Sequence, residues 1–341
     1  MKEYYPSLTG IRFIAASMVF FHHYNPISNR NSWPLLYDFF SEMHIGVTLF
    51  FFLSGFLIGD RYFEQKVNWK SFFINRFARI YPSFFILTTL TFIYIYYKTN
   101  VFNIKLYFLN ITFIKGFFDS LKFTGIAQSW SLTVEEFFYL LTPFLFMIIK
   151  KNKNFIYFLP IIFILLGIVI YFENIIFMLD FTFFGRCFEF FSGIYLALFL
   201  KNNKKLLTVK MTYIGSVFTF LGIFWLVYLK PGVGFYGNDL LLGKIINTFF
   251  FPLFAFTPLF IGLIKEKTFI NKFLSTQMIQ ILGKSSYAFY LIHLGFFSDF
   301  FRKYFDYWTV FVIINILSIF FYTKIEFFFH GLIRKKRTNR I

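Results

Sequence analysis

An arginine and a histidine, Arg12 and His23, lie eleven residues apart in the first apolar stretch of the sequence. On a helix of about 3.6 residues per turn this separation returns to nearly the same face, so one stripe carries a fixed cation and a titratable imidazole roughly 16 Å apart. Such groups are costly inside a bilayer and indicate a functional site. Two alternatives stay open: Arg12 is a snorkelling residue, and the adjacent histidines are polar anchors in the headgroup layer.

The composition places this stretch in a membrane. The chain has 341 residues, of which 58% are hydrophobic and 62 are Phe, more than one soluble core of this length can bury. The N-terminus has no basic region followed by a small-residue cleavage site, which predicts that the first stretch is a retained span. The single cysteine, Cys187, can form no internal disulfide and fits no metal-ligand spacing, so we expect no metal site.

The apolar stretches predict an all-α membrane protein with a single ten-helix transmembrane domain covering residues 1–341. Most of the 34 Lys and Arg residues fall in the segments that are cytoplasmic when the N-terminus is inside, and this places both termini and the basic tail 334–341 in the cytoplasm. The net charge of +18 is then explained by topology and anionic lipid rather than by nucleic acid. The expected spans are about 8–24, 44–60, 80–97, 131–149, 155–171, 183–200, 212–229, 245–264, 285–301 and 307–327.

In this topology several polar residues share the outer layer with His23. They are His44, Glu135, and the pair Arg186 and Glu189, whose spacing of three residues puts both on one helical face. The pair is equally interpretable as a structural ion pair.

The inner layer holds Arg76 and Arg79, which come just before the third expected span. Their i, i+3 spacing places two guanidinium groups on one side of a helix, which suits bidentate recognition of phosphate. The alternative is contact with anionic lipid.

Six blocks, in order along residues 5 to 330, resemble the signature of the membrane acyltransferase 3 family, the integral-membrane O-acyltransferases that modify bacterial surface glycans. The blocks are LTGIRFIAASMVFFHHY, GVTLFFFLSGFLIG, RFARIYP, QSWSLTVEEFFYL, GRCFEFFSGIYLA and LGKSSYAFYLIH. One departure lies near the end of the chain, where the family commonly has a Glu followed closely by Pro. This chain has Glu326 followed by FFFHG, so no role is assigned to Glu326.

The resemblance implies a ten-span protein of the bacterial cytoplasmic (inner) membrane. It would move an acyl group, usually acetyl, from cytoplasmic acyl-CoA to a hydroxyl of an envelope polysaccharide, glycolipid or glycoside, with no metal. It also implies which positions matter, namely Arg12, His23, Arg76, Arg79, Trp130, Glu135, Ser286, Tyr287, Tyr290 and His293.

A sugar hydroxyl needs a base to take its proton as it attacks a thioester, and histidine is the side chain best suited to this at neutral pH. We assign this role to His23, because His22 is expected to point about 100° away. Glu135 could orient His23 or stabilise its protonated form. Arg12, Arg76 and Arg79 are assigned to the CoA head group. Further substrate or oxyanion candidates are Trp130, Arg186, Glu189, Tyr287, His293 and His44.

Other interpretations remain. Glu136 could form a capping box with Thr133, and His293 could be a packing histidine. A transporter or proton-coupled membrane protein would use the same His, Arg and Glu residues as a relay, although the sequence has no visible repeated halves. A structural subunit for glycan export would leave the spacing of Arg12 and His23 unexplained. The sequence does not distinguish among acceptors such as O-antigen, capsule, peptidoglycan, a lipid-linked sugar or a small glycoside.

Overall fold

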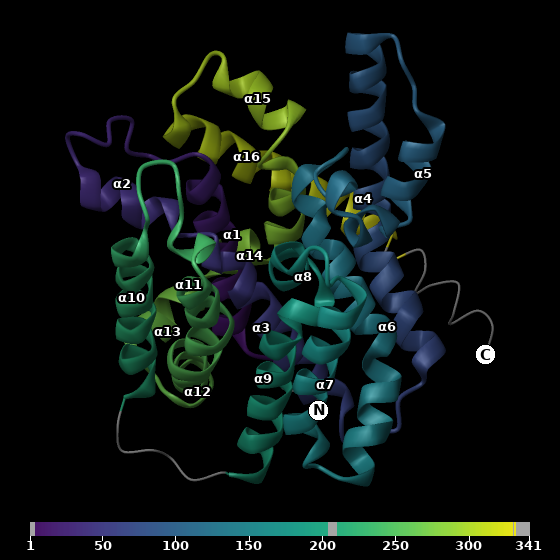
Figure 1. The fold of residues 1–341 in the computed structure, drawn as a ribbon, viewed down its shortest axis with the longest axis vertical. Helices are drawn as coiled ribbons and strands as arrows, with labels where there is room; N and C mark the ends of the chain where they lie inside the picture. The colour runs from purple at the N-terminus through teal and green to yellow at the C-terminus, as the bar shows by residue number, and fades with distance from the viewer. Residues whose placement is uncertain (1–3, 204–209, 330, 332–341) are drawn as a thin grey trace. The chain divides into compact units, whose positions relative to one another are not determined.

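The computed structural model describes residues 4–203, 210–329 and 331. Every regular element in these ranges is a helix, which confirms the all-α fold class (Figure 1). The basic tail 334–341 lies outside the described residues. The main helices are α1 (Pro6–His23), α2 (Pro34–Ser41), α3 (Ile45–Tyr62), α4 (Trp69–Thr99), α5 (Ile104–Ile111), α6 (Trp130–Lys151), α7 (Phe155–Ile170), α8 (Ile175–Phe181), α9 (Phe183–Asn202), α10 (Met211–Leu229), α11 (Leu241–Ile245), α12 (Thr257–Lys265), α13 (Phe269–Leu274), α14 (Gln277–Ile292), α15 (Phe296–Arg302) and α16 (Tyr307–Phe321).

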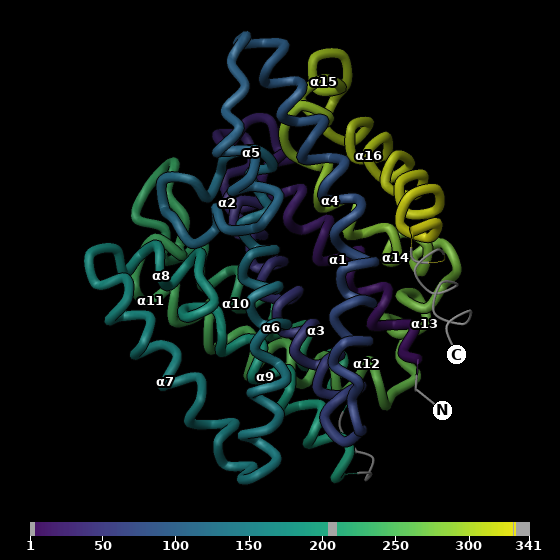
Figure 2. Tube along the Cα trace, turned by 90° about the vertical axis from the view of Figure 1, so that its right-hand side faces the viewer, coloured from purple at the N-terminus to yellow at the C-terminus, as the bar shows by residue number. Residues whose placement is uncertain are grey.

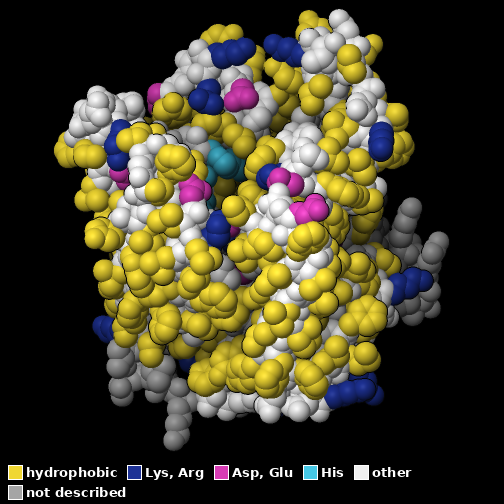
Figure 3. Space-filling model, in the orientation of Figure 1, with side chains coloured by type: hydrophobic (Ala, Val, Ile, Leu, Met, Phe, Trp, Pro, Cys, Tyr) yellow, Lys and Arg dark blue, Asp and Glu magenta, His cyan; other side chains and the backbone are white. Residues whose placement is uncertain are grey.

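Seven helical stretches within the described residues are long and apolar enough to cross a membrane. The chain is therefore a multi-pass membrane protein, whereas the count of ten spans and the cytoplasmic placement of the termini stay predictions. Hydrophobic side chains cover most of the face drawn in Figure 3. The seven stretches are Pro34–Tyr62, Trp69–Thr99, Ala127–Lys151, Ile175–Asn202, Met211–Leu229, Leu241–Lys265 and Tyr307–Phe329.

The expected span 285–301 differs from the structure, which has no continuous helix there. Helix α14 ends at Ile292, and Gly295 has φ 89°, a left-handed conformation that glycine adopts without steric cost. A new short helix, α15, then begins at Phe296. The helix is therefore broken over residues 293–295, although the apolar residues that predicted one span continue through the break.

The chain divides into two compact units, each assembled from two separate stretches of sequence. Unit 1 comprises residues 1–65 and 140–283, and unit 2 comprises residues 66–139 and 284–341. The division therefore does not follow two successive domains along the chain, and the single domain over 1–341 stays a prediction.

In unit 1, α3 and α9 pack closely against each other (Figure 1). A Cβ atom on Gly55 would lie 2.1 Å from the carbonyl oxygen of Phe190, and one on Gly193 would lie 2.2 Å from that of Phe52. At both glycines the backbone of one helix therefore touches the backbone of the other, an arrangement that small residues permit between membrane helices. Helix α7 packs on the same α9 (Figure 2).

A π-helix, η5 (Ile246–Phe256), joins α11 to α12 in unit 1 and contains Pro252. Proline supplies no N–H, and the carbonyl of Pro252 accepts a hydrogen bond of 2.8 Å from the Thr257 hydroxyl. The same carbonyl also accepts from the Thr257 backbone N–H, so Thr257 joins η5 to α12 through both its hydroxyl and its backbone. In unit 2, α5 packs against α4, and a second π-helix, η6 (Tyr322–Glu326), follows α16.

Candidate active site

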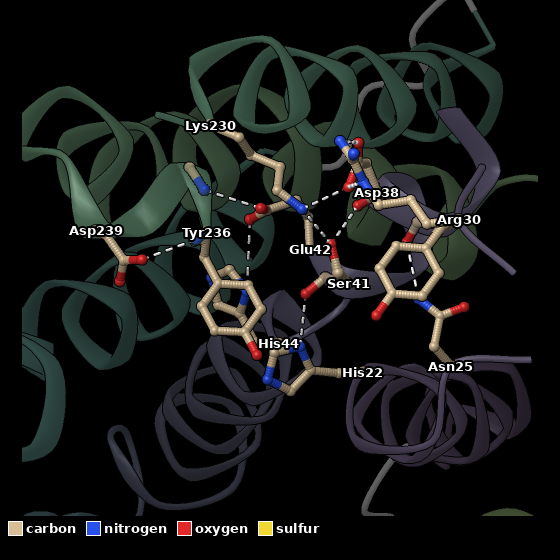
Figure 4. Close-up of polar contacts among 12 residues, drawn as sticks. His22, Asn25, Arg30, Asp38, Ser41, Glu42, His44, Lys230, Tyr236 and Asp239 are labelled. Atoms are coloured by element: carbon tan, nitrogen blue, oxygen red, sulfur yellow. Dashed lines mark hydrogen bonds and ion pairs between the residues drawn. The ribbon is translucent and has the colours of Figure 1, made fainter. Parts of the chain in front are cut away.

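Three histidine rings gather in unit 1 where α1 ends and α3 begins. The ring centroid of His22 lies 4.8 Å from that of His23. It lies 5.4 Å from that of His44 and 5.1 Å from that of Tyr236 (Figure 4). His23 is exposed, whereas His22 and His44 are partly buried. We call these four residues the histidine cluster. Arg12 and His23 do lie on one unbroken helix, α1, as their spacing predicts.

His22 differs from the expectation that it points away from the site. Its Nδ1 lies 2.6 Å from the backbone carbonyl oxygen of Ser41. A carbonyl oxygen only accepts, so Nδ1 must carry the proton, and the neutral ring then keeps its lone pair on Nε2. The periodicity of α1 separates the side chains of His22 and His23 by about 100°, but the segment after α2 brings an acceptor and His44 to the His22 side.

Glu42 lies behind His44. It is fully buried at 0% exposure, and its Oε1 accepts a hydrogen bond of 2.8 Å from the backbone N–H of Gly237. Its Oε2 lies 3.8 Å from Nδ1 of His44, which is within ion-pair distance. This separation is longer than a hydrogen bond, so Glu42 is an electrostatic neighbour of His44 and not a hydrogen-bonded partner of its ring.

Asp38, on α2, binds two cations at once. Arg30 donates to it through Nε and Nη2, at 3.1 and 2.7 Å, and Nζ of Lys230 donates to Oδ1 at 2.7 Å. Lys230 also donates to the Ser41 hydroxyl at 2.8 Å (Figure 4). No sequence motif singles out Asp38, Ser41 or Glu42 as site residues. An Asp and a Glu at the end of an amphipathic stretch between two spans were the available signal.

Tyr236 keeps its phenol proton in this setting. Burial raises the pKa of Tyr236, and the negative charges of Glu42 and Asp239 add to the shift. Its hydroxyl is therefore a donor at neutral pH.

Arg186 and Glu189 begin a buried polar chain deeper in unit 1. Arg186 Nε lies 2.9 Å from Glu189 Oε1, and Arg186 Nη2 donates to the Thr48 hydroxyl at 2.7 Å. Thr48 donates to Asn247 on η5 at 2.6 Å, and Asn247 donates to Asn238 at 3.1 Å. The i, i+3 spacing correctly predicted that Arg186 and Glu189 lie on one face, and they form an ion pair.

Unit 2 holds the second group of predicted residues. The Arg76 guanidinium lies over the Tyr139 ring, 4.7 Å from its centroid, and the Tyr139 hydroxyl donates to Glu135. A capping box needs its threonine at the N-cap, but α6 begins at Trp130, so Thr133 lies inside the helix. The prediction of a capping box formed by Thr133 and Glu136 is therefore wrong. Thr133 instead donates to the carbonyl of Phe113 at 2.7 Å.

The last predicted block also lies in unit 2. The Tyr287 hydroxyl donates to the Ile80 carbonyl at 2.8 Å, and Nδ1 of the fully buried His293 donates to the Tyr290 carbonyl at 2.7 Å. The Tyr290 hydroxyl lies 2.8 Å from that of Ser131. The Tyr287 and Tyr290 hydroxyl bonds connect α14 to α4 and α6, so the block has a structural role whatever its chemistry.

Glu326, which departs from the family pattern, is 5% exposed and lies within electrostatic range of Arg79. The acid is therefore buried in unit 2 although no proline follows it closely.

The predicted residues therefore fall into two sets. Unit 1 contains Arg12, His23, His44, Arg186 and Glu189. Unit 2 contains Arg76, Arg79, Trp130, Glu135, Tyr287 and His293. His23 and Glu135 belong to different units, so the role of Glu135 in orienting His23 stays a prediction. No group of His, Cys, Asp and Glu able to hold a metal is present among the described residues.

Comparison with known proteins adds to this geometry. Residues 5–323 match the acyltransferase domain of the acyltransferase 3 family. The chain is 31% identical over 172 residues to the peptidoglycan O-acetyltransferase OatA of Listeria monocytogenes, which covers 45% of this chain and 26% of that protein. It is 27% identical over 324 residues to the O-acetyltransferase OatA of Staphylococcus aureus, which covers 85% of this chain and 50% of that protein. No solved structure is significantly similar.

The apolar helices make this a multi-pass membrane protein, and the family match places it in the acyltransferase class. The family match extends over nearly the whole chain, and the chain belongs to the membrane acyltransferase 3 family. It spans half the length or less of these two curated relatives.

Proposed function

We propose that this protein is a membrane O-acetyltransferase that moves an acetyl group from cytoplasmic acetyl-CoA to a hydroxyl of a cell-envelope glycan. The observation that carries the proposal is the alignment of 85% of the chain with an O-acetyltransferase, within a family match to residues 5–323. The acceptor class follows from the peptidoglycan named for the Listeria relative. The protein would act in the bacterial cytoplasmic membrane.

The histidine cluster supplies the chemistry that this transfer needs. His23 is the general base, because it is exposed at the end of α1 and can meet a hydroxyl from outside. It takes the proton of the attacking hydroxyl, the acceptor oxygen bonds to the thioester carbon, and the CoA thiolate leaves and is protonated. Tyr236 and Arg186 are donors of unit 1 able to stabilise negative charge on the carbonyl oxygen.

The donor is assigned to the arginines. Arg76 and Arg79 are one helical turn apart on α4, and Arg12 lies toward the first turns of α1. Guanidinium groups bind phosphate with bidentate geometry, so Arg76 and Arg79 of unit 2 would hold the CoA phosphates, and Arg12 of unit 1 stays a separate candidate for the same donor.

The test uses the purified full chain in lipid nanodiscs with acetyl-CoA carrying a labelled acetyl group. Soluble muropeptides and a short capsular oligosaccharide are offered as acceptors, and an increment of about 42 Da per acetyl is sought by mass spectrometry. Label on a glycan hydroxyl supports the proposal. For the transporter alternative, the same purified protein is reconstituted into liposomes. Proton flux across these liposomes, without consumption of acetyl-CoA, would establish that alternative instead.

A further inference from the structure

The segment that follows α10 is fastened to the segment around the end of α2 at three points. Lys230 donates to Asp38 and to the Ser41 hydroxyl, and the Gly237 N–H donates to Glu42. The two segments are about 190 residues apart in sequence and belong to the same unit.

The lysine contact is deeply buried and is held from both sides. The side chain of Lys230 is 7% exposed and that of Asp38 is 11% exposed. Burying an ammonium group is unfavourable unless a carboxylate and hydrogen-bond acceptors compensate its charge, so the position of Nζ is narrowly defined. Arg30 donates to both oxygens of the same Asp38 carboxylate and so holds it in place for Lys230.

The same contact continues to a histidine. Ser41 receives a hydrogen bond from Lys230 at its hydroxyl and gives one to the Asp38 carbonyl at 2.7 Å. The carbonyl of Ser41 is the acceptor for Nδ1 of His22, at 2.6 Å. One residue thus receives the lysine on its side chain and the imidazole on its backbone (Figure 4).

We propose that Lys230 is a positioning residue for the reaction, acting through Asp38 and Ser41 to hold His22 with its proton on Nδ1 and its ring against His23. This rests on the proposed function. A ring held at Nδ1 keeps one tautomer and one orientation, which determines the polar surroundings of the neighbouring base. Without Lys230, the end of α2 loses its link to the segment after α10, and the Ser41 carbonyl is no longer fixed.

The variants are Lys230→Met, Lys230→Arg and, as a matched control, Lys201→Met. Lys201 is also a unit 1 lysine, with the Asp60 carbonyl and Glu64 as partners. In the nanodisc assay we expect Lys230→Met to lower kcat about tenfold with the acetyl-CoA KM unchanged, because misplacing a group near the reacting atoms costs rate rather than donor binding. Lys230→Arg should restore most of the rate, and Lys201→Met should behave as the parent.

The pH profile separates positioning from simple destabilisation. The titratable or charged groups around the His22 ring are His23 on its own helix, His44 and Glu42 before α3, and Tyr236 and Lys230 on the segment after α10. Removing the lysine cation removes repulsion against a protonated imidazole, so the acid limb of kcat should move to higher pH in Lys230→Met and stay in Lys230→Arg. An unmoved limb together with parental kcat overturns the inference.

A double-mutant cycle tests the route. Because Lys230 acts through His22, Lys230→Met should cost no further rate in a His22→Ala background. Fully additive losses would contradict the route through His22.

If Lys230→Met is not recovered folded, Ser41→Ala carries the test, since it removes the linking hydroxyl and keeps the carbonyl that accepts from His22. Parental kcat in folded Ser41→Ala would then overturn the inference. An inactive parent would overturn the proposed function instead.

Discussion

Lys230 in unit 1 and Lys115 in unit 2 are both buried lysines, but their partners differ. Lys230 faces the carboxylate of Asp38 at 2.7 Å. Lys115 is 1% exposed and donates to the backbone carbonyls of Thr124 and Ile126, the latter at 2.7 Å. Burial without a carboxylate lowers the pKa of Lys115 to about 7. The comparison teaches that a buried lysine bonded to a carboxylate links two segments through an ion pair, whereas Lys115 closes a loop through backbone carbonyls alone.

The largest expected effect tests whether proton transfer belongs to unit 1. His23→Ala should lower the transfer rate about 10²–10⁴-fold, because it removes the general base. His22→Ala should cost about tenfold, since it removes only a neighbouring ring. The measurement is single-turnover acetyl transfer in nanodiscs. If His22→Ala is the more severe of the two, the base is His22, whose Nε2 lone pair the structure already defines.

The next effect concerns the buried pair of unit 1. Arg186→Met should destabilise the protein by about 3–5 kcal/mol, because it leaves the Glu189 carboxylate buried without a compensating charge. Arg186→Met with Glu189→Leu should recover most of the loss. Thermal unfolding in detergent measures both variants. Equal unfolding temperatures for the parent and Arg186→Met would show that the pair contributes no net stability.

Donor binding should belong to unit 2. Arg76→Ala and Arg79→Ala should each raise the acetyl-CoA KM about tenfold or more, since a charge-assisted hydrogen bond contributes about 1.5–3 kcal/mol. Initial rates over a range of acetyl-CoA concentrations measure this, with Lys98→Ala, near the other end of α4, as the control. An unchanged KM with reduced membrane insertion would favour contact with anionic lipid.

The smallest effect concerns Lys115 and pH. The unfolded lysine titrates near pH 10.5 and the folded one near 7. Between these values the unfolded chain binds the extra proton, so stability should rise as the pH is raised from about 7 toward 10. Lys115→Met should remove this contribution, while Lys122→Met, in the same loop, should keep it. The unfolding temperatures of each variant at about pH 7 and about pH 9.5 provide the measurement. A parent and Lys115→Met with the same pH dependence would contradict the assignment.

The sequence could predict the membrane class and the helical faces, because apolar length and 3.6-residue periodicity are local properties. It correctly placed Arg12 with His23 on one helix and Arg186 with Glu189 on one face. It could not predict the partners of Ser41, because the lysine and the imidazole that reach it come from segments far away in the chain.

The interrupted span at residues 285–301 was missed for a different reason. The helix ends at Ile292 and the chain turns at Gly295, whose φ is positive, but a hydropathy window averages over this break because the residues around it are apolar. Likewise, Thr133 with Glu136 has the letters of a capping box, but α6 already begins at Trp130. A local motif indicates only a possible start of a helix, whereas the residue at which the helix begins depends on tertiary contacts.

The glycine crossing of α3 and α9 has a consequence for how this protein can evolve. Thr48 and Arg186 lie seven residues before Gly55 and Gly193 respectively, so the hydrogen bond and the crossing share one register along two parallel helices. Each glycine faces backbone, so no neighbouring side chain can shrink to accommodate a larger residue. A substitution at either glycine would separate the helices and draw the arginine away from its hydroxyl two turns distant. Compensatory substitutions of neighbouring side chains should therefore not rescue a larger residue at position 55 or 193. Evolution would retain both glycines or lose the buried arginine site.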